Sequence, residues 1–574
     1  MKNSTLRACL LLFFLSIIIY FPSLNNKFVL DDPSQIINNP AVHSISNIPK
    51  LFLGSTFAGG GGLEGVYYKP VMTTFYTVIY SLFGANPLPF HLIQIILHTL
   101  NAFLVFLFLK HFFKLSLSLF LSLIFLVHPI NTEAVVYISN LQDTLFFFFG
   151  MLALLQLSKD KLRFKNYLLY TLFALLSLLS KETGTLFVLI SMVFAATRFK
   201  KPVGFIMLNV CLITFYGLVR YAAVGIPNSS DTPFPIMRLP FWERVLNIPS
   251  IIFHYLKTYF YPKDLAVGQM WVIKGINFKD FYLPLVANFL VLSGLILLGL
   301  RLKNSPQFKT FLFFTTWFIL GLGLHLQIIP LDATIADRWM YFPGVGILGI
   351  IGIIFSVIAS PRGAWQSQIR LLRRGLLAMT IIILILLSIR SYTRTLDWKD
   401  GLTLALHDTK TNTDSFVMEN NLGFEYIEVG NYEEALPHIE KSTFLAPYWW
   451  LNWNNLGVIY RHFGDTQKAE QAFKKSAENT NNFYLPYQNL AELYLHFKDP
   501  RDAETFIAQT SEKLTLNDSL WFLFSITEYK LGNLENALKA AQQAQFLNPN
   551  NQTYAQLVTA LQNNQKILIQ KPEF

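Results

Sequence analysis

Residues 90–110 read FHLIQIILHTLNAFLVFLFLK, an apolar run of the length of about 20 residues at which an α-helix spans a bilayer. The run holds no acidic residue, and its single lysine, Lys110, stands at its end. Runs of the same kind recur through the first two-thirds of the chain. This pattern predicts an all-α fold class that begins with a polytopic membrane domain.

The apolar runs predict about eleven membrane spans. They lie at residues 5–22, 90–110, 115–130, 142–157, 166–180, 183–197, 203–222, 281–300, 309–328, 341–360 and 375–391. Segment 248–261 is apolar but contains His254 and Lys257, and we expect it to lie along the membrane surface. No small-x-small cleavage site follows the first run, so we interpret it as an uncleaved transmembrane helix.

Charge is sparse and unevenly distributed. The chain is 53% hydrophobic and 14% charged, whereas a soluble chain carries about a quarter charged residues. Its net charge of +11 comes from short loops between apolar runs, as the positive-inside rule requires, so no nucleic-acid partner is predicted. With the basic loops in the cytosol, loop 23–89 and the C-terminal part fall outside. We therefore predict a multi-pass integral membrane protein whose C-terminal part lies outside the cytosol.

The C-terminal part repeats with the 34-residue period of the tetratricopeptide repeat (TPR). The residues in phase are Leu422, Leu456, Leu490 and Phe524, together with Ala435, Ala469, Ala503 and Ala537. This spacing predicts a TPR α-solenoid. The predicted domains are a membrane domain at 1–395, a linker at 396–415, four repeats and a capping helix at 416–567, and a tail at 568–574.

Two adjacent carboxylates, Asp31 and Asp32, follow the first span in the stretch FVLDDP. Acidic side chains close to a membrane are costly unless they are solvated, paired or functional. They are candidates for a catalytic base that takes a proton from a substrate hydroxyl. The alternative is structural, because Asp32 before Pro33 is an ordinary way to begin a helix.

Further polar residues stand where apolar runs end. The supporting polar cluster predicted from them is His128, Glu133, Asp143, Lys181 and Glu182. Such residues transfer protons or bind metal at some membrane faces, and in others they only cap helix ends. No metal site and no cofactor is predicted from this pattern.

Arg338 opens the tenth run and is a candidate for binding a donor phosphate, because a guanidinium binds phosphate in a bidentate manner. The alternative is that it anchors the membrane interface beside Trp339 and Tyr341. The chain has no glycine-rich loop with phosphate-binding spacing.

Within the repeats, Asn421, Asn455 and Asn489 each precede a repeat leucine. A ladder of carboxamides can bind a peptide backbone, since each amide both donates and accepts hydrogen bonds. These three residues are therefore candidates for an acceptor-binding groove. The alternative is that they hold neighbouring repeats together.

The motifs together resemble the transmembrane and TPR-containing O-mannosyltransferases and their bacterial relatives, which have the GT-C glycosyltransferase fold. The resemblance is carried by residues 28–42, 68–70, 90–92 with His98, 128–135, 180–182, 337–343 and 397–398. The family commonly has Glu where this chain has Asp337, Arg where it has Lys69, and Gly-Arg-Ala-Asp near 139–143.

The resemblance implies that Asp31 and Asp32 form the first-loop catalytic motif and that Arg338 meets the departing phosphate. It implies a membrane glycosyltransferase that moves a hexose such as mannose from a polyprenyl-phosphate donor to a protein acceptor on the exoplasmic side. The predicted partners are the lipid bilayer, the polyprenyl-phosphate sugar and the acceptor. The alternative function is a non-enzymatic, membrane-anchored TPR scaffold for surface-polysaccharide or protein-complex assembly.

Overall fold

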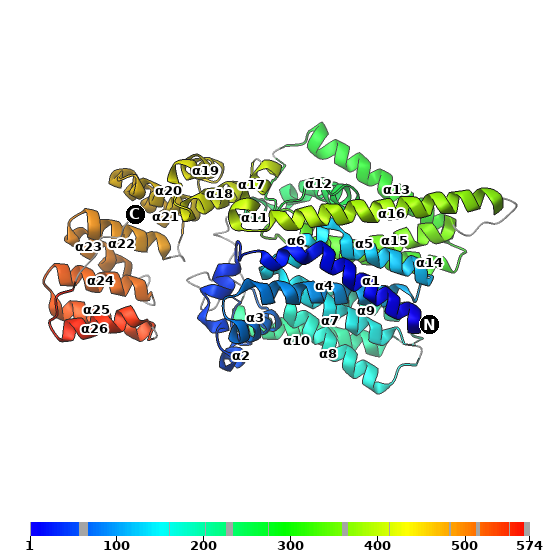
Figure 1. Cartoon of the computed structure of the whole chain (residues 1–574), viewed down its shortest axis with the longest axis horizontal. Helices are drawn as coiled ribbons and strands as arrows, with labels where there is room; N and C mark the ends of the chain where they lie inside the picture. Colours follow the sequence, from blue (N-terminus) through cyan, green and yellow to red (C-terminus); the bar gives the residue numbers. More distant parts are fainter. Residues whose placement is uncertain are drawn as a thin grey trace. The chain divides into compact units, whose positions relative to one another are not determined.

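The computed structural model shows a helical chain that divides into two compact units, Met1–Thr413 and Asp414–Phe574 (Figure 1). It describes residues 2–56, 67–159, 161–200, 202–225, 234–273, 275–358, 366–412, 414–480, 484–511, 517–549 and 551–567. Within these ranges the one β-pairing joins Gln269 to Ile335, and the regular elements are helices. The predicted all-α fold class is confirmed.

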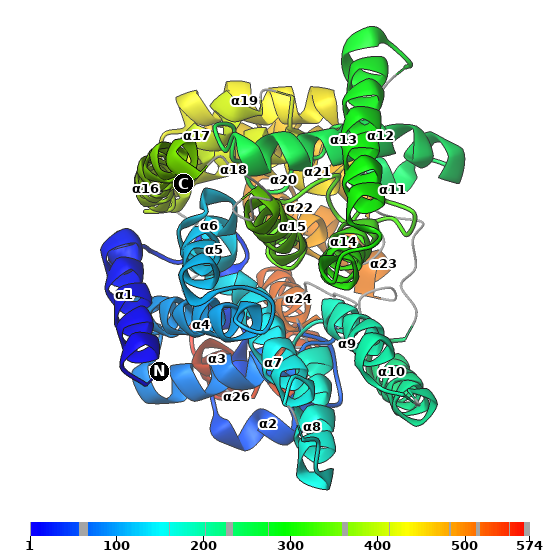
Figure 2. The same ribbon diagram turned by 90° about the vertical axis from the view of Figure 1, so that its right-hand side faces the viewer.

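The first unit is a bundle of apolar helices. Its longer helices are α1 (Lys2–Tyr20), α3 (Pro70–Phe83), α4 (Pro87–Leu109), α5 (Leu115–Val127), α7 (Leu141–Leu157), α8 (Phe164–Ser180), α9 (Thr185–Arg198), α10 (Val203–Val224), α12 (Phe241–Phe260), α13 (Leu283–Leu302), α14 (Gln307–Gly323), α15 (Pro343–Ile358), α16 (Gln366–Asp397) and α17 (Gly401–Thr411). Helix α7 packs against α4 and α8, and α14 packs against α15. Helices α15 and α16 run lengthwise in Figure 1 and are foreshortened in Figure 2.

Each of the eleven predicted spans coincides with a helix of this unit. Six helices of the described chain are long and apolar enough to cross a membrane, or seven if a bent pair is one span. Shorter apolar helices add to them, including α3, which the sequence analysis did not count. The protein is therefore a membrane protein, and the number of eleven spans stays a prediction.

The bent pair shows why some predicted spans are shorter than expected. Helix α5 ends at Val127, and α6 (Thr132–Val136) follows after a bend of 50°. Pro129 lies at the bend, where its ring removes a backbone N–H donor and prevents the helix from continuing. Helix α12 also differs from its prediction, since it begins at Phe241 and contains Pro249.

Close packing of two membrane helices depends on glycine in α15. A Cβ atom at Gly346 would lie 2.6 Å from the backbone nitrogen of Phe318 in α14. Small residues of this kind let membrane helices approach, because dispersion contacts replace the hydrophobic effect inside a bilayer. A side chain at this position would push α14 and α15 apart.

The second unit consists of four helix pairs and a capping helix. They are α18 (Phe416–Glu428), α19 (Tyr432–Leu445), α20 (Trp450–His462), α21 (Thr466–Glu478), α22 (Leu485–Phe497), α23 (Pro500–Ser511), α24 (Asp518–Lys530), α25 (Leu534–Leu547) and α26 (Gln552–Gln562). The four in-phase alanines are fully buried, one in the second helix of each pair. A Cβ at Gly457 would meet the Phe473 ring at 2.5 Å, which explains glycine at this repeat position.

The segment between the units differs from its prediction as a linker. Most of residues 396–415 forms helix α17, which belongs to the first unit. The segment reads as a linker in the sequence because α17 is short and polar. Part of its packing is a buried ion pair, described below, rather than apolar contact. The predicted tail, 568–574, lies outside the described residues.

Candidate active site

The two first-loop carboxylates lie between α1 and α3 in different environments. Leu30 has a φ of 53°, in the left-handed region that a branched side chain rarely adopts. Strain of this kind costs about 1–3 kcal/mol and persists where neighbouring contacts hold it. Beyond this turn the Asp31 side chain is exposed, whereas Asp32 is fully buried. Of the two adjacent carboxylates, only Asp31 is exposed to solvent.

Asp32 links the loop after α1 to the segment at Ser139, just before α7, by hydrogen bonds. Its Oδ1 accepts hydrogen bonds from the Ser139 backbone N–H at 2.8 Å and from the Ser139 hydroxyl at 2.6 Å. Its Oδ2 accepts a bond from the Val29 N–H at 3.0 Å. The side chain makes no capping bond to the helix that begins at Pro33, so the helix-cap alternative does not describe it.

Asp31 is held mainly through its backbone and through Tyr137. The Asp31 N–H donates to the Tyr137 hydroxyl at 3.0 Å. The surrounding protein displaces water from the carboxylate and raises its pKa, while the Tyr137 hydroxyl, Arg338 and Lys69 act to lower it. A raised pKa makes a carboxylate a better proton acceptor.

The pKa of Asp32 is raised to about 7, chiefly because the carboxylate is buried. Its hydrogen bonds from Ser139 and Val29 favour the charged form and offset part of this effect. The neighbouring Asp31 charge raises the pKa further. The charge of Asp31 thus acts on the pKa of its buried neighbour.

Arg338 approaches this region from the turn at Asp337–Met340. Its guanidinium forms a hydrogen-bonded ion pair with Glu133 Oε1, and its backbone N–H donates to Glu133 Oε2 at 3.1 Å. The Arg338 side chain is 16% exposed and that of Glu133 only 3%. Glu133 therefore orients Arg338 and neutralises part of its charge. Burial raises the pKa of the adjacent Asp337 well above its ordinary value.

Three other predicted members of the cluster, Asp143, Lys181 and Glu182, are each paired with a residue of opposite charge. Lys181 Nζ lies 2.6 Å from Asp143 Oδ1, and Arg220 Nε lies 3.5 Å from Glu182 Oε1. The charges of Glu182, Lys181 and Asp143 all shift the pKa of one buried lysine, Lys69. The charge of Lys69 in turn acts to lower the pKa of Asp31. The structure therefore brings these three residues into the region of the first-loop motif.

His128 is placed differently from the rest of the predicted cluster. Its Nδ1 accepts a bond from the Ile130 N–H at 3.2 Å, and its Nε2 lies 2.9 Å from the Tyr259 carbonyl oxygen. The ring also stacks on the Tyr259 ring, with centroids 4.4 Å apart. Both ring nitrogens have backbone partners, so His128 joins α12 to the bend after α5.

Several residues at this site were not assigned roles by the sequence analysis. Ser139 and Tyr137 bind the carboxylates, and Tyr67 donates to Asp332 Oδ2 at 2.7 Å. The charge of Asp332 acts to raise the pKa of Asp31, and that of Lys69 acts to lower it. Lys69 lies in a stretch that carries the family resemblance, whereas Ser139 lies where the chain departs from the family pattern, so the sequence offered a direct signal only for Lys69.

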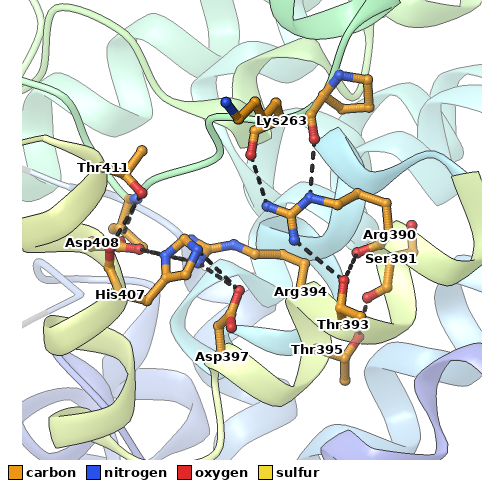
Figure 3. Close-up of polar contacts among 12 residues, drawn as sticks. Lys263, Arg390, Ser391, Thr393, Arg394, Thr395, Asp397, His407, Asp408 and Thr411 are labelled. Carbon is orange, nitrogen blue, oxygen red and sulfur yellow. Dashed lines mark hydrogen bonds and ion pairs between the residues drawn. The ribbon is translucent and has the colours of Figure 1, made fainter.

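A second ionic cluster joins the end of α16 to α17 (Figure 3). Arg394 NH1 lies 3.1 Å from Asp408 Oδ1 and 3.4 Å from Asp397 Oδ2. His407 Nδ1 lies 2.8 Å from Asp408 Oδ1, and the Val267 N–H donates to Asp408 Oδ2 at 2.8 Å. Burial acts to raise the pKa of Asp408, but the Arg394 guanidinium holds it below its ordinary value.

The repeat asparagines make hydrogen bonds between neighbouring repeats. Asn455 Nδ2 donates to Asn420 Oδ1 at 3.0 Å, and Asn489 Nδ2 donates to Asn454 Oδ1 at 2.7 Å. These four side chains are buried, while Asn421 is half-buried. The bonds support the structural alternative for Asn455 and Asn489, and the acceptor groove stays a prediction.

Fold and site define a class of protein: a multi-helix membrane protein with a loop-built carboxylate and cation site, joined to a TPR array. The tetratricopeptide repeat family matches residues 452–483. Protein O-mannosyl-transferase F38B6.6 of Caenorhabditis elegans is 24% identical over 431 residues, covering 70% of this chain and 57% of that protein. Human protein O-mannosyl-transferase TMTC3 is 22% identical over 471 residues, covering 75% and 50%.

A shorter stretch is more similar. Human protein O-mannosyl-transferase TMTC1 is 34% identical over 150 residues, which cover 25% of this chain and 17% of that protein. The chain spans about half the length of the curated relatives it matches. The predicted resemblance to transmembrane and TPR-containing protein O-mannosyltransferases is confirmed.

Proposed function

We propose that this protein is a membrane glycosyltransferase that moves a hexose, such as mannose, from a polyprenyl phosphate to a hydroxyl group of a protein acceptor. The observation that carries the proposal is the exposed carboxylate of Asp31, whose backbone N–H donates to the Tyr137 hydroxyl and whose neighbour Asp32 is buried. The names of the relatives support the same reaction class.

The chemistry follows from these positions. The Asp31 carboxylate removes the proton of the acceptor hydroxyl while the hydroxyl oxygen forms a bond to C1 of the sugar. The bond between C1 and the phosphate oxygen breaks, and the phosphate leaves with the electron pair. The charge of Arg338, which acts on Asp31, is available to stabilise the leaving phosphate. Glu133 orients the guanidinium for this role.

We infer that the reaction takes place on the exoplasmic side of a bacterial inner membrane. The basic residues of the short loops support this orientation, since such residues remain in the cytosol. The same orientation puts the TPR unit outside, where it would recruit a protein acceptor. A lipid-linked donor suits a site next to apolar helices, because its tail remains in the bilayer.

The test is transfer by the purified full chain from a panel of polyprenyl-phosphate sugars to a peptide rich in serine and threonine. We expect one hexose to be transferred by the wild type and not by Asp31→Asn. No transfer from any donor, with the protein folded, would contradict the proposal. That outcome would favour the alternative function, a membrane-anchored TPR scaffold, which needs no Asp31 carboxylate.

A further inference from the structure

Helix α4 carries a polar stripe through the apolar interior of the first unit. Gln94, His98 and Asn101 are spaced by four and three residues, so they lie on one face of the helix. All three side chains are buried, with an exposed fraction of at most 1%. Polar side chains inside a membrane segment are costly to keep and usually have a function. Their hydrogen-bond partners show what this stripe holds in place.

Gln94 holds the segment that binds the first-loop carboxylates. Its Nε2 donates to the Tyr137 carbonyl oxygen at 2.8 Å. The Tyr137 hydroxyl accepts a bond from the Asp31 backbone N–H. Ser139, two residues further on, donates to the Asp32 carboxylate from its backbone and its hydroxyl. Gln94 therefore fixes the piece of backbone from which both aspartates are bound.

His98 and Asn101 hold the end of the turn that carries Arg338. Tyr341 directly follows this turn. The Tyr341 hydroxyl lies 2.7 Å from His98 Nδ1, and Asn101 Nδ2 donates to it at 3.1 Å. His98 Nε2 lies 3.0 Å from the Leu126 carbonyl oxygen, which can only accept, so in the neutral ring the proton is on Nε2. His98 Nδ1 is then the acceptor, and the Tyr341 hydroxyl is the donor.

Tyr341 connects α4 to Arg338 directly. Its backbone N–H donates to the Arg338 carbonyl oxygen at 3.1 Å. Its ring packs edge-to-face against Phe125 and Phe147, with centroids 5.0 and 4.9 Å apart. The Tyr341 side chain is thus fixed to α4 while its backbone is bonded to Arg338. A change at His98 therefore reaches the backbone of Arg338 through a single residue.

We infer that the polar stripe of α4 positions the two halves of the active site relative to each other, Gln94 on the carboxylate side and His98 on the Arg338 side. The inference rests on the proposed function, in which Asp31 takes a proton and Arg338 stabilises the leaving phosphate. Both groups act at the same sugar carbon, so their separation matters in the transition state. One helix that binds both supporting segments keeps this separation constant. Gln94, His98 and Tyr341 are thus positioning residues.

The first test removes one hydroxyl group. Tyr341→Phe keeps the aromatic ring and loses the hydrogen bond to His98. Tyr170→Phe is the matched control, because the buried Tyr170 hydroxyl donates to Asn209 between α8 and α10. For Tyr341→Phe we expect kcat for sugar transfer to fall about 10- to 100-fold and the donor KM to stay within about twofold, since a misplaced group acts mainly on the transition state. Tyr170→Phe should keep the wild-type kcat.

A double-mutant cycle shows whether Tyr341 acts through Arg338. On an Arg338→Ala background, Tyr341→Phe should lower the rate further by less than about twofold, because the group that it positions is absent. The same criterion applies to Gln94→Met on an Asp31→Asn background. A purely structural role would give the same fold loss on both backgrounds, and that result would overturn the inference. A wild-type kcat in Tyr341→Phe, or an equal loss in Tyr170→Phe, would also overturn it.

Hydrogen exchange tests the positioning without any sugar transfer. Amides of residues 335–341 should exchange up to about tenfold faster in Tyr341→Phe, and those of residues 135–141 should do so in Gln94→Met. Tyr170→Phe should change neither segment, and wild-type exchange in both variants would overturn the inference. Failure of the proposed function is distinguishable. A wild type that transfers no sugar, with the expected changes in exchange, overturns the transfer reaction and leaves the positioning of the two segments standing.

Discussion

Replacing each first-loop aspartate by asparagine should separate catalysis from positioning. Asp31→Asn keeps the shape of an exposed side chain and removes the group that accepts the proton. Asp32→Asn alters a buried side chain whose two oxygens accept three hydrogen bonds. The expected phenotypes differ because the two side chains have different surroundings, although they are adjacent in sequence.

For Asp31→Asn we expect a loss of rate of about 10²–10⁴-fold, the usual contribution of a general base. At about 1.36 kcal/mol for each factor of ten, this adds about 2.7–5.4 kcal/mol to the barrier. The free energy of unfolding should change by less than about 0.5 kcal/mol, as for most exposed positions. The Asp31 backbone bond to Tyr137 does not involve the substituted atoms.

For Asp32→Asn we expect a loss of both stability and activity. The new NH₂ group faces at least one of the N–H donors of Val29 and Ser139, so one accepted hydrogen bond is lost and a buried donor is left without an acceptor. A loss of this kind costs about 1–3 kcal/mol. Because the folded-state pKa of about 7 lies above the unfolded value, the wild type loses stability as the pH rises from about 4 through 7. The difference in the free energy of unfolding between wild type and Asp32→Asn should therefore be largest near pH 4.

The assay is sugar transfer by the purified variants, with their thermal unfolding in the same detergent. Ser139→Ala is the matched control for Asp32→Asn, because it removes only the hydroxyl bond of 2.6 Å. It should lower the melting temperature less than Asp32→Asn does and retain part of the activity. Full activity in Asp31→Asn would refute the reasoning. So would an Asp32→Asn variant that is inactive but as stable as wild type, since Asp32 would then be the catalytic group.

Three further predictions concern the rest of the chain. With the native cysteines replaced, new cysteines at Ser34 and Asn563 should both react with an impermeant thiol reagent from outside. Labelling of only one would place the two positions on opposite sides of the membrane, so the predicted number of spans between them would be wrong by an odd number. Asn489→Ala should destabilise the repeats by about 1 kcal/mol through the lost bond between repeats, measured by thermal unfolding; greater loss of transfer to protein than to a short peptide would instead indicate a groove. Asp408→Asn should cost about 3–5 kcal/mol, because it removes the fully buried carboxylate that pairs with Arg394 and leaves only the longer pair with Asp397. An unchanged melting temperature would count against the Arg394–Asp408 pair. The wild-type pair contributes stability above about pH 4 that is lost as the pH falls through the lowered pKa of Asp408.

Local signals in the sequence were sufficient for the fold class. Apolar runs predicted where helices lie, because a membrane requires backbone groups to be satisfied within each helix. The period of 34 residues predicted the repeats, and the buried Ala435 and Ala469 show why small residues recur there. Helix ends were less predictable, since α5 stops at the proline bend rather than at the end of its apolar run.

By itself, the sequence determined the membrane domain, the TPR array and the importance of the Asp31–Asp32 pair, because each is marked by composition, period or motif. Only the tertiary structure decided which carboxylate is exposed, that Asp32 binds Ser139, and that Arg338 pairs with Glu133. These properties depend on residues more than 60 positions apart meeting in space. Hydrogen bonding and burial act between such neighbours, and no local pattern in the chain records them.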